Sequence, residues 1–241
     1  DGERGHPSPD ALQARLHGPD VLRPHPRLLW TENTHNRAGG TVMTPGHQRS
    51  LLGVAADFGL ATHLDGARIF NAAAALGLPV EQVAAGFDSV YVDLTKGLSC
   101  PMGALVAGDR AFVEEARARR RALGGGMRQA GIIGAAGLVA LETMIDRLED
   151  DHANARWLAE RLAGIDGYGV EAHLVETNIV FADVSGLGPS SEVAARLLDM
   201  GLIVLNSPPS EIRMVFHRHI GRAETETALR ILEVLAGEIL D

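Results

Sequence analysis

Lys96 is the only lysine in a chain of 241 residues that holds 22 lysine and arginine residues in total. All the other basic side chains apart from histidine are therefore arginine. Arginine stays charged, whereas lysine is a primary amine that can lose its proton and attack a carbonyl carbon. A single position that keeps lysine predicts Schiff-base chemistry there, with chance retention as the alternative.

Asp65 lies 31 residues before Lys96, which is about the length of one strand–helix–strand unit. Each residue stands where an apolar run gives way to a loop, and ligands of open α/β sheets bind beyond the carboxyl ends of the strands. A lysine amine and a carboxylate that pairs with a pyridine nitrogen are together typical of a pyridoxal phosphate site. The alternative for Asp65 is the N-cap of the helix that follows it.

Two arginines are candidates for binding anions. Arg128 follows the triple glycine 124–126, whose amides precede a predicted helix and suit a phosphate, although a flexible helix break fits equally well. Arg213 alternates with apolar residues in a predicted strand, so it needs an anionic partner, either a substrate carboxylate or an internal acid. His217 and His219 have the spacing of one strand face but no evident third ligand, so no metal site is predicted.

Alternating apolar strands and helices predict an α/β fold for the first part of the chain. Its strands are expected at 26–32, 60–65, 88–94 and 103–108, and its helices at 46–59, 68–77, 110–123 and 130–163. The later segments predict a smaller α+β unit, with strands at 178–184, 201–206 and 211–218 and helices at 190–200 and 223–240. The predicted domains are therefore 1–165 and 166–241.

Composition excludes some classes of protein. A net charge of −9 argues against non-specific nucleic-acid binding, and the basic run 117–121 is expected to be an exposed helix face. The longest apolar run, 130–141, is too short to span a membrane and predicts a buried helix. Cys100 is the only cysteine and cannot form an intramolecular disulfide, which together with the lack of a recognisable signal peptide predicts a cytoplasmic location.

Six stretches of the sequence carry a family resemblance. They are "ENTHN" (32–36), "HLDGARIFNAAAALG" (63–77), "TKGLSCPMGALVAG" (95–108), "LGGGMRQAGIIGAAGLVALE" (123–142), "TNIVFADV" (177–184) and "IRMVFH" (212–217). In this order they resemble the threonine aldolases, which belong to the aromatic amino acid β-eliminating lyase group with the type I pyridoxal phosphate fold. The resemblance implies a mostly parallel sheet with flanking helices, plus a smaller C-terminal α+β domain.

The resemblance also implies roles for individual residues. Lys96 would form the Schiff base with pyridoxal 5'-phosphate, Asp65 would pair with its pyridine nitrogen, and Arg68 would help to hold it. Arg213 would bind the carboxylate of an amino-acid substrate, and Arg128 would reach a phosphate, in this family often that of a neighbouring subunit. The implied activity is cleavage of threonine or a related β-hydroxy-α-amino acid to glycine and an aldehyde. The alternatives are β-elimination on the same fold, and a non-catalytic or split-enzyme fragment.

The chain also departs from the family pattern. It starts roughly a third of the way in, past the family's Gly-Thr phosphate turn and ring-stacking histidine. A second family histidine has no clear counterpart, since His25 is out of register and Leu22 is near the expected place. His35 is a candidate near the site, although a loop histidine bonded to backbone is favoured. We therefore expect a homo-oligomer, dimer or tetramer, or a companion N-terminal segment to complete the site.

Overall fold

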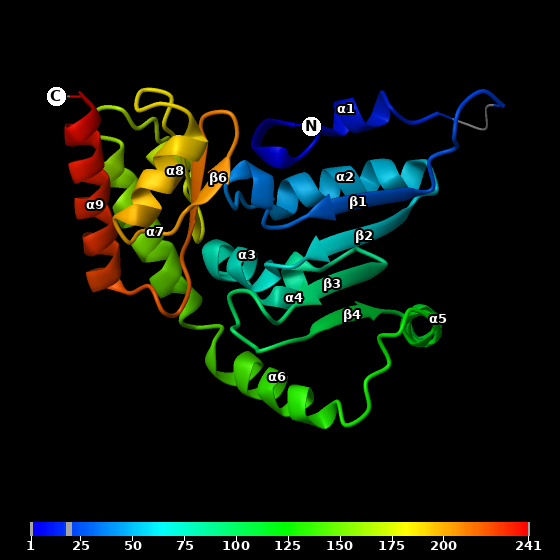
Figure 1. Cartoon of the computed structure of the whole chain (residues 1–241). Helices are drawn as coiled ribbons and strands as arrows, with labels where there is room; N and C mark the ends of the chain where they lie inside the picture. The colour runs from blue at the N-terminus through cyan, green and yellow to red at the C-terminus, as the bar shows by residue number, and fades with distance from the viewer. Residues whose placement is uncertain (1, 18–20, 241) are drawn as a thin grey trace. The chain divides into compact units, whose positions relative to one another are not determined.

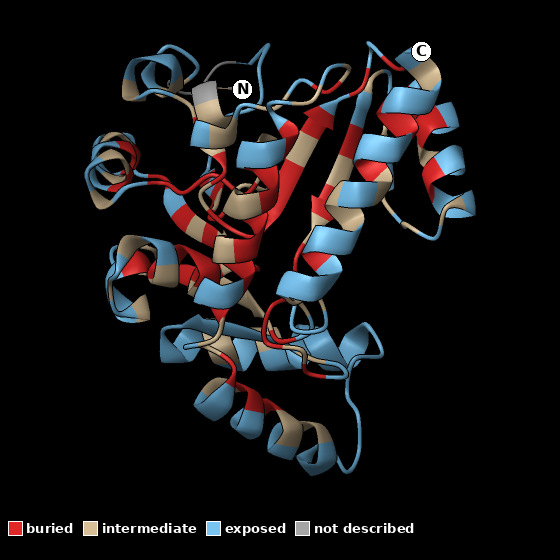
Figure 2. Cartoon of the chain, turned by 90° about the vertical axis from the view of Figure 1, so that its left-hand side faces the viewer, coloured by how far each residue is buried: buried red, intermediate tan, exposed pale blue. Residues whose placement is uncertain are grey.

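The computed structural model describes residues 2–17 and 21–240, which form two compact units (Figure 1). The first unit comprises Asp1–Ala38 and Val42–Asp146, and the second comprises Gly39–Thr41 and Arg147–Asp241. Buried residues gather in the strands and on the helix faces that meet them (Figure 2). Among the described residues, no helix combines the length and apolar composition needed to cross a membrane.

The first unit contains a four-stranded sheet in the order β1-β2-β3-β4. Strands β1, β2 and β3 run parallel, and β4 is antiparallel to β3, so the predicted mostly parallel sheet is confirmed. The elements in chain order are η1 (Glu3–Gly5), α1 (Pro9–Gln13), β1 (Leu28–Glu32), η2 (Asn36–Ala38), α2 (Pro45–Asp57), β2 (Ala61–Gly66), α3 (Ile69–Leu76), α4 (Val80–Val83), β3 (Ser89–Asp93), β4 (Ala104–Gly108), α5 (Arg110–Ala122) and α6 (Gly131–Thr143).

Local signals explain where these helices begin and end. The hydroxyl of Thr44 accepts a hydrogen bond from the His47 amide and so caps α2, which starts at a proline. Helix α3 ends at Gly77, whose φ of +62° lies in the left-handed region that glycine adopts without strain. Asp109 caps α5 in the same way as Thr44 caps α2, through the Phe112 amide.

The two faces of the sheet differ. On one face, side chains of α2 and α3 pack against β1, β2 and β3 in a core that includes Leu29, Leu51, Leu64, Ile69 and Val90. The alternate residues of the same strands form the other face, and there Trp30 pairs with His63 and Glu32 pairs with Asp65 in register. Glu32, His63 and Asp65 therefore share this second face.

Two expectations for the region 130–163 are wrong. The predicted single helix is two helices, α6 and α7 (Leu148–Leu162), which belong to different units. The predicted burial of α6 also fails: only Gly137 and Ala140 are buried, while Ile132 is 73% exposed. An apolar run is buried only where another element packs on it, and α6 lies beyond β4, away from α2 and α3 (Figure 1).

The second unit holds a three-stranded antiparallel sheet in the order β5-β7-β6. Its elements are α7, η3 (Ala172–Leu174), β5 (Ile179–Asp183), α8 (Ser190–Asp199), β6 (Leu205–Ser207), β7 (Glu211–Val215) and α9 (Arg222–Leu240). Helix α7 contributes Ala155, Leu158 and Leu162 to the core of this unit. The border between the compact units therefore precedes α7, whereas the predicted domain boundary near residue 165 follows it.

We expect His152 on α7 to make the stability of the second unit depend on pH. Burial lowers the pKa of His152 to about 4, with Glu149 opposing and Arg156 adding to the shift. An unfolded histidine takes up its proton near its ordinary pKa of 6.5. The free energy of unfolding should therefore be highest above that pH and fall as the pH is lowered toward 4.

Urea unfolding followed by the fluorescence of Trp157, the only tryptophan in this unit, measures the effect at pH 7.5 and pH 4.5. His152→Gln should reduce the difference in unfolding midpoint between the two pH values. The matched control is His219→Gln, because His219 is exposed. If the unfolding midpoint of His152→Gln changed between the two pH values as much as that of the parent, the role assigned to His152 would be wrong.

Candidate functional site

The chemistry-bearing residues of the first unit meet at the carboxyl ends of β1, β2 and β3. Glu32 of β1 is opposite Asp65 of β2, and Asp65 is opposite Tyr91 of β3. Asp93 ends β3, and Lys96 follows three residues later. The expected placement of Asp65 and Lys96 at one edge of a parallel sheet is therefore observed.

Lys96 forms an ion pair with Asp93, in which the ammonium Nζ lies 3.1 Å from the carboxylate Oδ2. The loop that carries Lys96 is closed by backbone hydrogen bonds, from the Cys100 amide to the Leu94 carbonyl (2.9 Å) and from the Leu94 amide to the Gly103 carbonyl (3.1 Å). The Lys96 side chain remains 35% exposed, so its amine is held in place yet accessible.

Asp93 is the centre of a small hydrogen-bond network. Its Oδ1 accepts from the amide (2.8 Å) and the hydroxyl (2.6 Å) of Thr95, and its Oδ2 accepts from the Tyr91 hydroxyl (3.3 Å). Burial opposes ionisation of Asp93, but the bonds from Thr95 and the ion pair with Lys96 outweigh it and hold the pKa of Asp93 below its ordinary value. Asp93 is therefore a carboxylate at neutral pH, which keeps the neighbouring amine in position.

Asp65 is not the N-cap of α3. That position is Arg68, which makes no side-chain capping bond. The Asp65 Oδ1 instead accepts from the Ala67 amide at 3.0 Å, in the turn between β2 and α3. Gly66 makes this turn possible, because a Cβ at that position would lie 2.6 Å from the Tyr91 carbonyl oxygen.

Arg68 lies among three carboxylates. Burial lowers the pKa of Arg68 below its ordinary value, and the charges of Glu32, Asp93 and Asp65 oppose that shift. The guanidinium therefore lies in the electrostatic field of the acids at the ends of β1, β2 and β3. This arrangement brings together three of the predicted site residues, Lys96, Asp65 and Arg68, within one unit.

A pocket of about 220 Å³ opens beside Asp65. It is lined by Gly5, His6, Pro7, Trp30, Thr31, Glu32, His35 and Asp65, all from the first unit. His35 lies here as expected, and its Nδ1 accepts from the Ala38 amide at 3.2 Å. Its Nε2 is 3.8 Å from the Glu32 carboxylate. His35 is therefore both bonded to backbone and part of the pocket.

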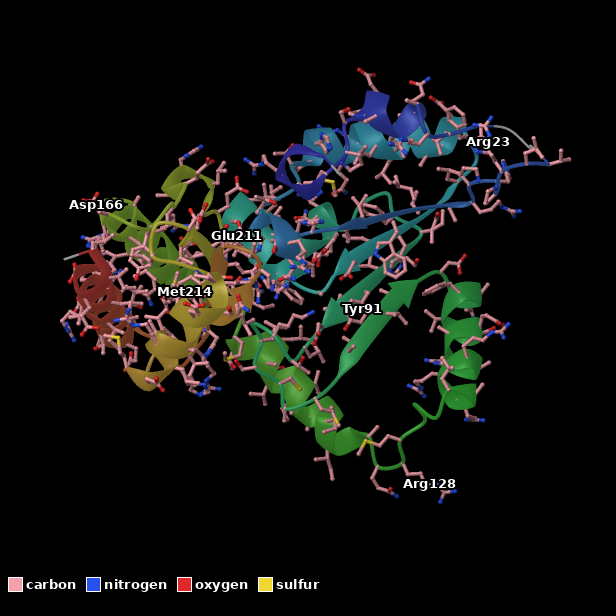
Figure 3. The ribbon with its side chains drawn as sticks, turned by 45° about the horizontal axis from the view of Figure 1, so that its top comes forward. Arg23, Tyr91, Arg128, Asp166, Glu211 and Met214 are labelled. Atoms are coloured by element: carbon pink, nitrogen blue, oxygen red, sulfur yellow. The ribbon has the colours of Figure 1, made fainter. Side chains whose placement is uncertain are left out.

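Arg128 is exposed on the loop between α5 and α6, well apart from Tyr91 and the ends of the strands (Figure 3). Two of the three glycines before it do not offer free amides. The Gly124 amide donates to the Arg121 carbonyl (3.1 Å) and the Gly125 amide to the Arg120 carbonyl (2.8 Å), so both serve to end α5. The predicted basic helix face at 117–121 is exposed, as expected.

Arg213 lies in the second unit, at the middle of β7, where it pairs with Phe181 of β5 and Leu205 of β6. Its guanidinium is 6.0 Å from the centre of the Phe181 ring, and its side chain is half-buried. Strand β7 ends at Val215, before His217 and His219, so these two histidines do not share a strand face. In residues 2–17 and 21–240 no cluster of three or more His, Cys, Asp or Glu side chains could hold a metal ion.

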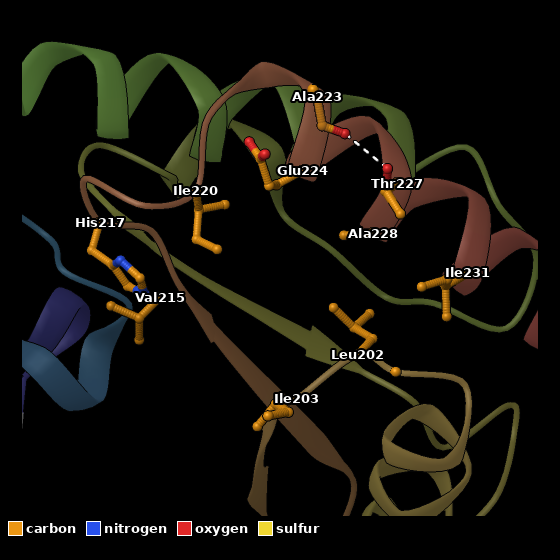
Figure 4. Close-up of a pocket in the computed structure, with 11 residues that line it drawn as sticks. Leu202, Ile203, Val215, His217, Ile220, Ala223, Glu224, Thr227, Ala228 and Ile231 are labelled. Atoms are coloured by element: carbon orange, nitrogen blue, oxygen red, sulfur yellow. Dashed lines mark hydrogen bonds between the residues drawn. The ribbon is translucent and has the colours of Figure 1, made fainter.

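A larger pocket of about 660 Å³ lies within the second unit (Figure 4). Most of its lining is apolar, and Thr227, one of its polar residues, bonds to the carbonyl of Ala223 within α9 (2.9 Å). Its Glu224 accepts from the Gly221 amide at 2.9 Å. This pocket has one carboxylate, Glu224, whereas the smaller pocket is lined by both Glu32 and Asp65. The smaller pocket also lies at the carboxyl ends of the strands that precede Lys96, so it is the better candidate site.

Sequence reasoning missed Asp93, His6 and Thr31. For Asp93 a signal existed, since an aspartate three residues before a lysine, with threonine between them, suits a turn that pairs the two charges. His6 and Thr31 had no such signal, because only the fold brings these two residues to one pocket.

Comparisons with known proteins agree with this geometry. A model of the beta-eliminating lyase family matches residues 1–186. The chain is 36% identical to low-specificity L-threonine aldolase 1 of Arabidopsis thaliana, over 91% of this chain and 63% of the relative. It is 34% identical to the low specificity L-threonine aldolase of Escherichia coli, over 89% of this chain and 62% of the relative.

Among solved structures, the chain resembles Leishmania major threonine aldolase with a TM-score of 0.74, at 19% identity, over 99% of this chain and 69% of that one. This likeness confirms the expected type I fold. The chain spans a little under two thirds of the length of the curated relatives that it matches.

Proposed function

The chain belongs to the beta-eliminating lyase family, and we propose that it acts as a pyridoxal phosphate-dependent lyase. The proposed substrate is threonine or a related β-hydroxy-α-amino acid, which is cleaved to glycine and an aldehyde. The observation that carries the proposal is the single lysine, held at 3.1 Å by Asp93 at the same sheet edge as Asp65 and Arg68.

The side chains at this edge fit the proposed cofactor. The primary amine of Lys96 matches an aldehyde, and the carboxylate of Asp65 matches a pyridine nitrogen. The guanidinium of Arg68 matches an anionic group. His6, which lines the pocket beside Asp65, also has a buried Nε2 atom without a partner among the described residues. Such atoms are expected where a polar ligand binds.

When bound, pyridoxal phosphate supplies a carbonyl for amines and a ring that accepts electrons from the bond being broken. Lys96 would hold this group through its primary amine. Asp93 holds the Lys96 ammonium until the proton leaves Nζ. Asp65 would supply the carboxylate that pairs with the pyridine nitrogen.

The three arginines have separate proposed roles. Arg68 helps to hold the cofactor, and Arg213 orients the substrate carboxylate through a charge-assisted pair. Arg128 reaches a phosphate, and its exposed position is compatible with a phosphate of another subunit. A homo-oligomer is part of this proposal, and it would cover the exposed Ile132, Leu138 and Val139 of α6.

Product analysis tests the function directly. Protein incubated with pyridoxal phosphate should absorb in the visible range, and borohydride should remove that band. With L-threonine it should release glycine and acetaldehyde, the latter measured by its reduction with alcohol dehydrogenase and NADH.

The same assay separates the alternatives. β-Elimination on the same fold would yield 2-oxobutanoate and ammonia instead of glycine. A protein with neither the visible band nor either product would contradict the proposal and favour a fragment that needs a companion chain.

A further inference from the structure

His63 is a partly buried histidine of β2 to which the proposed function gives no role. Every second side chain of a strand points to the same face, so His63 lies on the face of the sheet that carries Asp65, two residues later. Burial lowers the pKa of His63, and the negative charge of Asp65 opposes that shift. The two side chains are therefore close enough for the charge on one to affect the other.

Two neighbouring strands fix the imidazole of His63 in place. A hydrogen bond of 2.8 Å joins its Nδ1 to the hydroxyl of Ser89 on β3. On the other side, the ring of Trp30 on β1 meets it edge-on, with 4.7 Å between the ring centres. Both residues are the register partners of His63. The position of the imidazole relative to Asp65 is thus set by the sheet and not by a loop.

The other titratable and charged groups on this face lie around Asp65. Glu32 of β1 and Tyr91 of β3 are the register partners of Asp65, two residues along from those of His63. Burial is the largest cause that raises the pKa of Tyr91, so its phenol carries no charge at neutral pH. Arg68 lies in the field of Asp65 and two further carboxylates. Burial and the charge of Asp65 account for the shift in the pKa of His63.

We propose that His63 is a positioning residue that acts through Asp65 and makes the pairing of Asp65 with a pyridine nitrogen depend on pH. Neutral His63 leaves the full charge of Asp65 to a protonated ring nitrogen. Protonated His63 places a second cation beside the same carboxylate, and the two positive charges repel each other. This inference rests on the proposed function. Because coupling is reciprocal, a cation held at Asp65 must also make His63 harder to protonate.

The first measurement needs no cofactor. NMR titration of the histidine ring protons between pH 7.5 and pH 4.5 follows the protonation of His63, which is identified by its Overhauser contact with the ring of Trp30. In Asp65→Asn the titration midpoint of His63 should move to lower pH, because the carboxylate that opposes the effect of burial is gone. The matched control is Asp57→Asn, which removes an exposed carboxylate at the end of α2.

The second measurement is the dissociation constant of pyridoxal phosphate at pH 7.5 and pH 5.5, from titrations followed by visible absorption. The pKa of His63 lies below its ordinary value of 6.5, so His63 gains its charge at the acidic end of this range. The affinity of the parent should therefore fall about fivefold more than that of His63→Gln, which takes up no proton. The titrations of Lys96 and of the cofactor itself are common to both proteins. His173→Gln, at an exposed histidine of the second unit, should behave like the parent.

The outcomes are distinct. A lower midpoint of His63 in Asp65→Asn, together with a weaker pH dependence of affinity in His63→Gln, supports the inference. An unchanged midpoint, or an equal pH dependence in the parent and His63→Gln, overturns it and leaves the proposed function intact. A purely structural role of His63 would give His63→Gln the same loss of affinity at both pH values.

If His63→Gln does not fold, the parent protein decides the second measurement. Loading with pyridoxal phosphate should then lower the midpoint of His63, and a midpoint that does not move overturns the inference. A parent protein that takes up no pyridoxal phosphate overturns both the inference and the proposed function.

Discussion

Lys96→Arg is expected to reduce turnover of threonine to the limit of detection while the protein stays folded. Arginine keeps a positive charge beside Asp93, so the ion pair at the end of β3 is retained. It offers no amine that can lose its proton at neutral pH and attack a carbonyl. The change therefore separates the charge of this residue from its nucleophilicity.

The uniqueness of Lys96 makes the readout clear. Borohydride treatment followed by peptide mass spectrometry should find the reduced cofactor on the peptide that contains Lys96, because the chain has no other lysine. The matched control is the double variant Lys96→Arg/Arg119→Lys, which restores one lysine on the exposed α5. This control should be as inactive as Lys96→Arg. Glycine release by Lys96→Arg at the parent rate would show that the only lysine has no chemical role.

Asp65→Asn is expected to lower turnover by orders of magnitude even when the assay is saturated with cofactor. Asparagine lacks the negative charge that keeps a proton on the pyridine nitrogen, so the ring accepts electrons less well. Its side-chain oxygen can still accept from the Ala67 amide, which Asp65 does at 3.0 Å. The free energy of unfolding should therefore change by less than about 1 kcal/mol.

Two measurements on the same sample distinguish a chemical role from a structural one. The initial rate is measured at saturating pyridoxal phosphate, and the urea midpoint is measured without it. The exposed Asp57→Asn at the end of α2 is the control for loss of one carboxylate. If Asp65→Asn were nearly as active as this control, the role of Asp65 would be limited to the structure of the β2–α3 turn.

Much of the secondary structure was readable from local sequence. The strands around Leu64 and Val90 are short apolar runs between turn signals, and Gly77 marks the end of α3 because it adopts a left-handed conformation. The uniqueness of Lys96 and its spacing from Asp65 depend only on the order of residues. Parallel neighbouring strands then bring such positions to one edge, so this part of the candidate site was predictable.

The tertiary structure alone decided which residues complete the site. His6 and His47 are 41 positions apart in the sequence, and no periodic pattern links either of them to Asp65. The pairing of Asp93 with Lys96 is local, since three residues separate them, but the closeness of Asp93 to the charge of Arg68 depends on the tertiary fold.

Burial depended on the same long-range packing. The apolar sequence of α6 predicted a buried helix and that of α7 an extension of it, yet Ile132 is exposed and Leu158 is buried in a different unit. A sequence by itself determines the hydrophobicity of a helix and thus the free energy available from covering it. Whether another element lies close enough to cover it depends on contacts between distant parts of the chain, and only the folded structure specifies those.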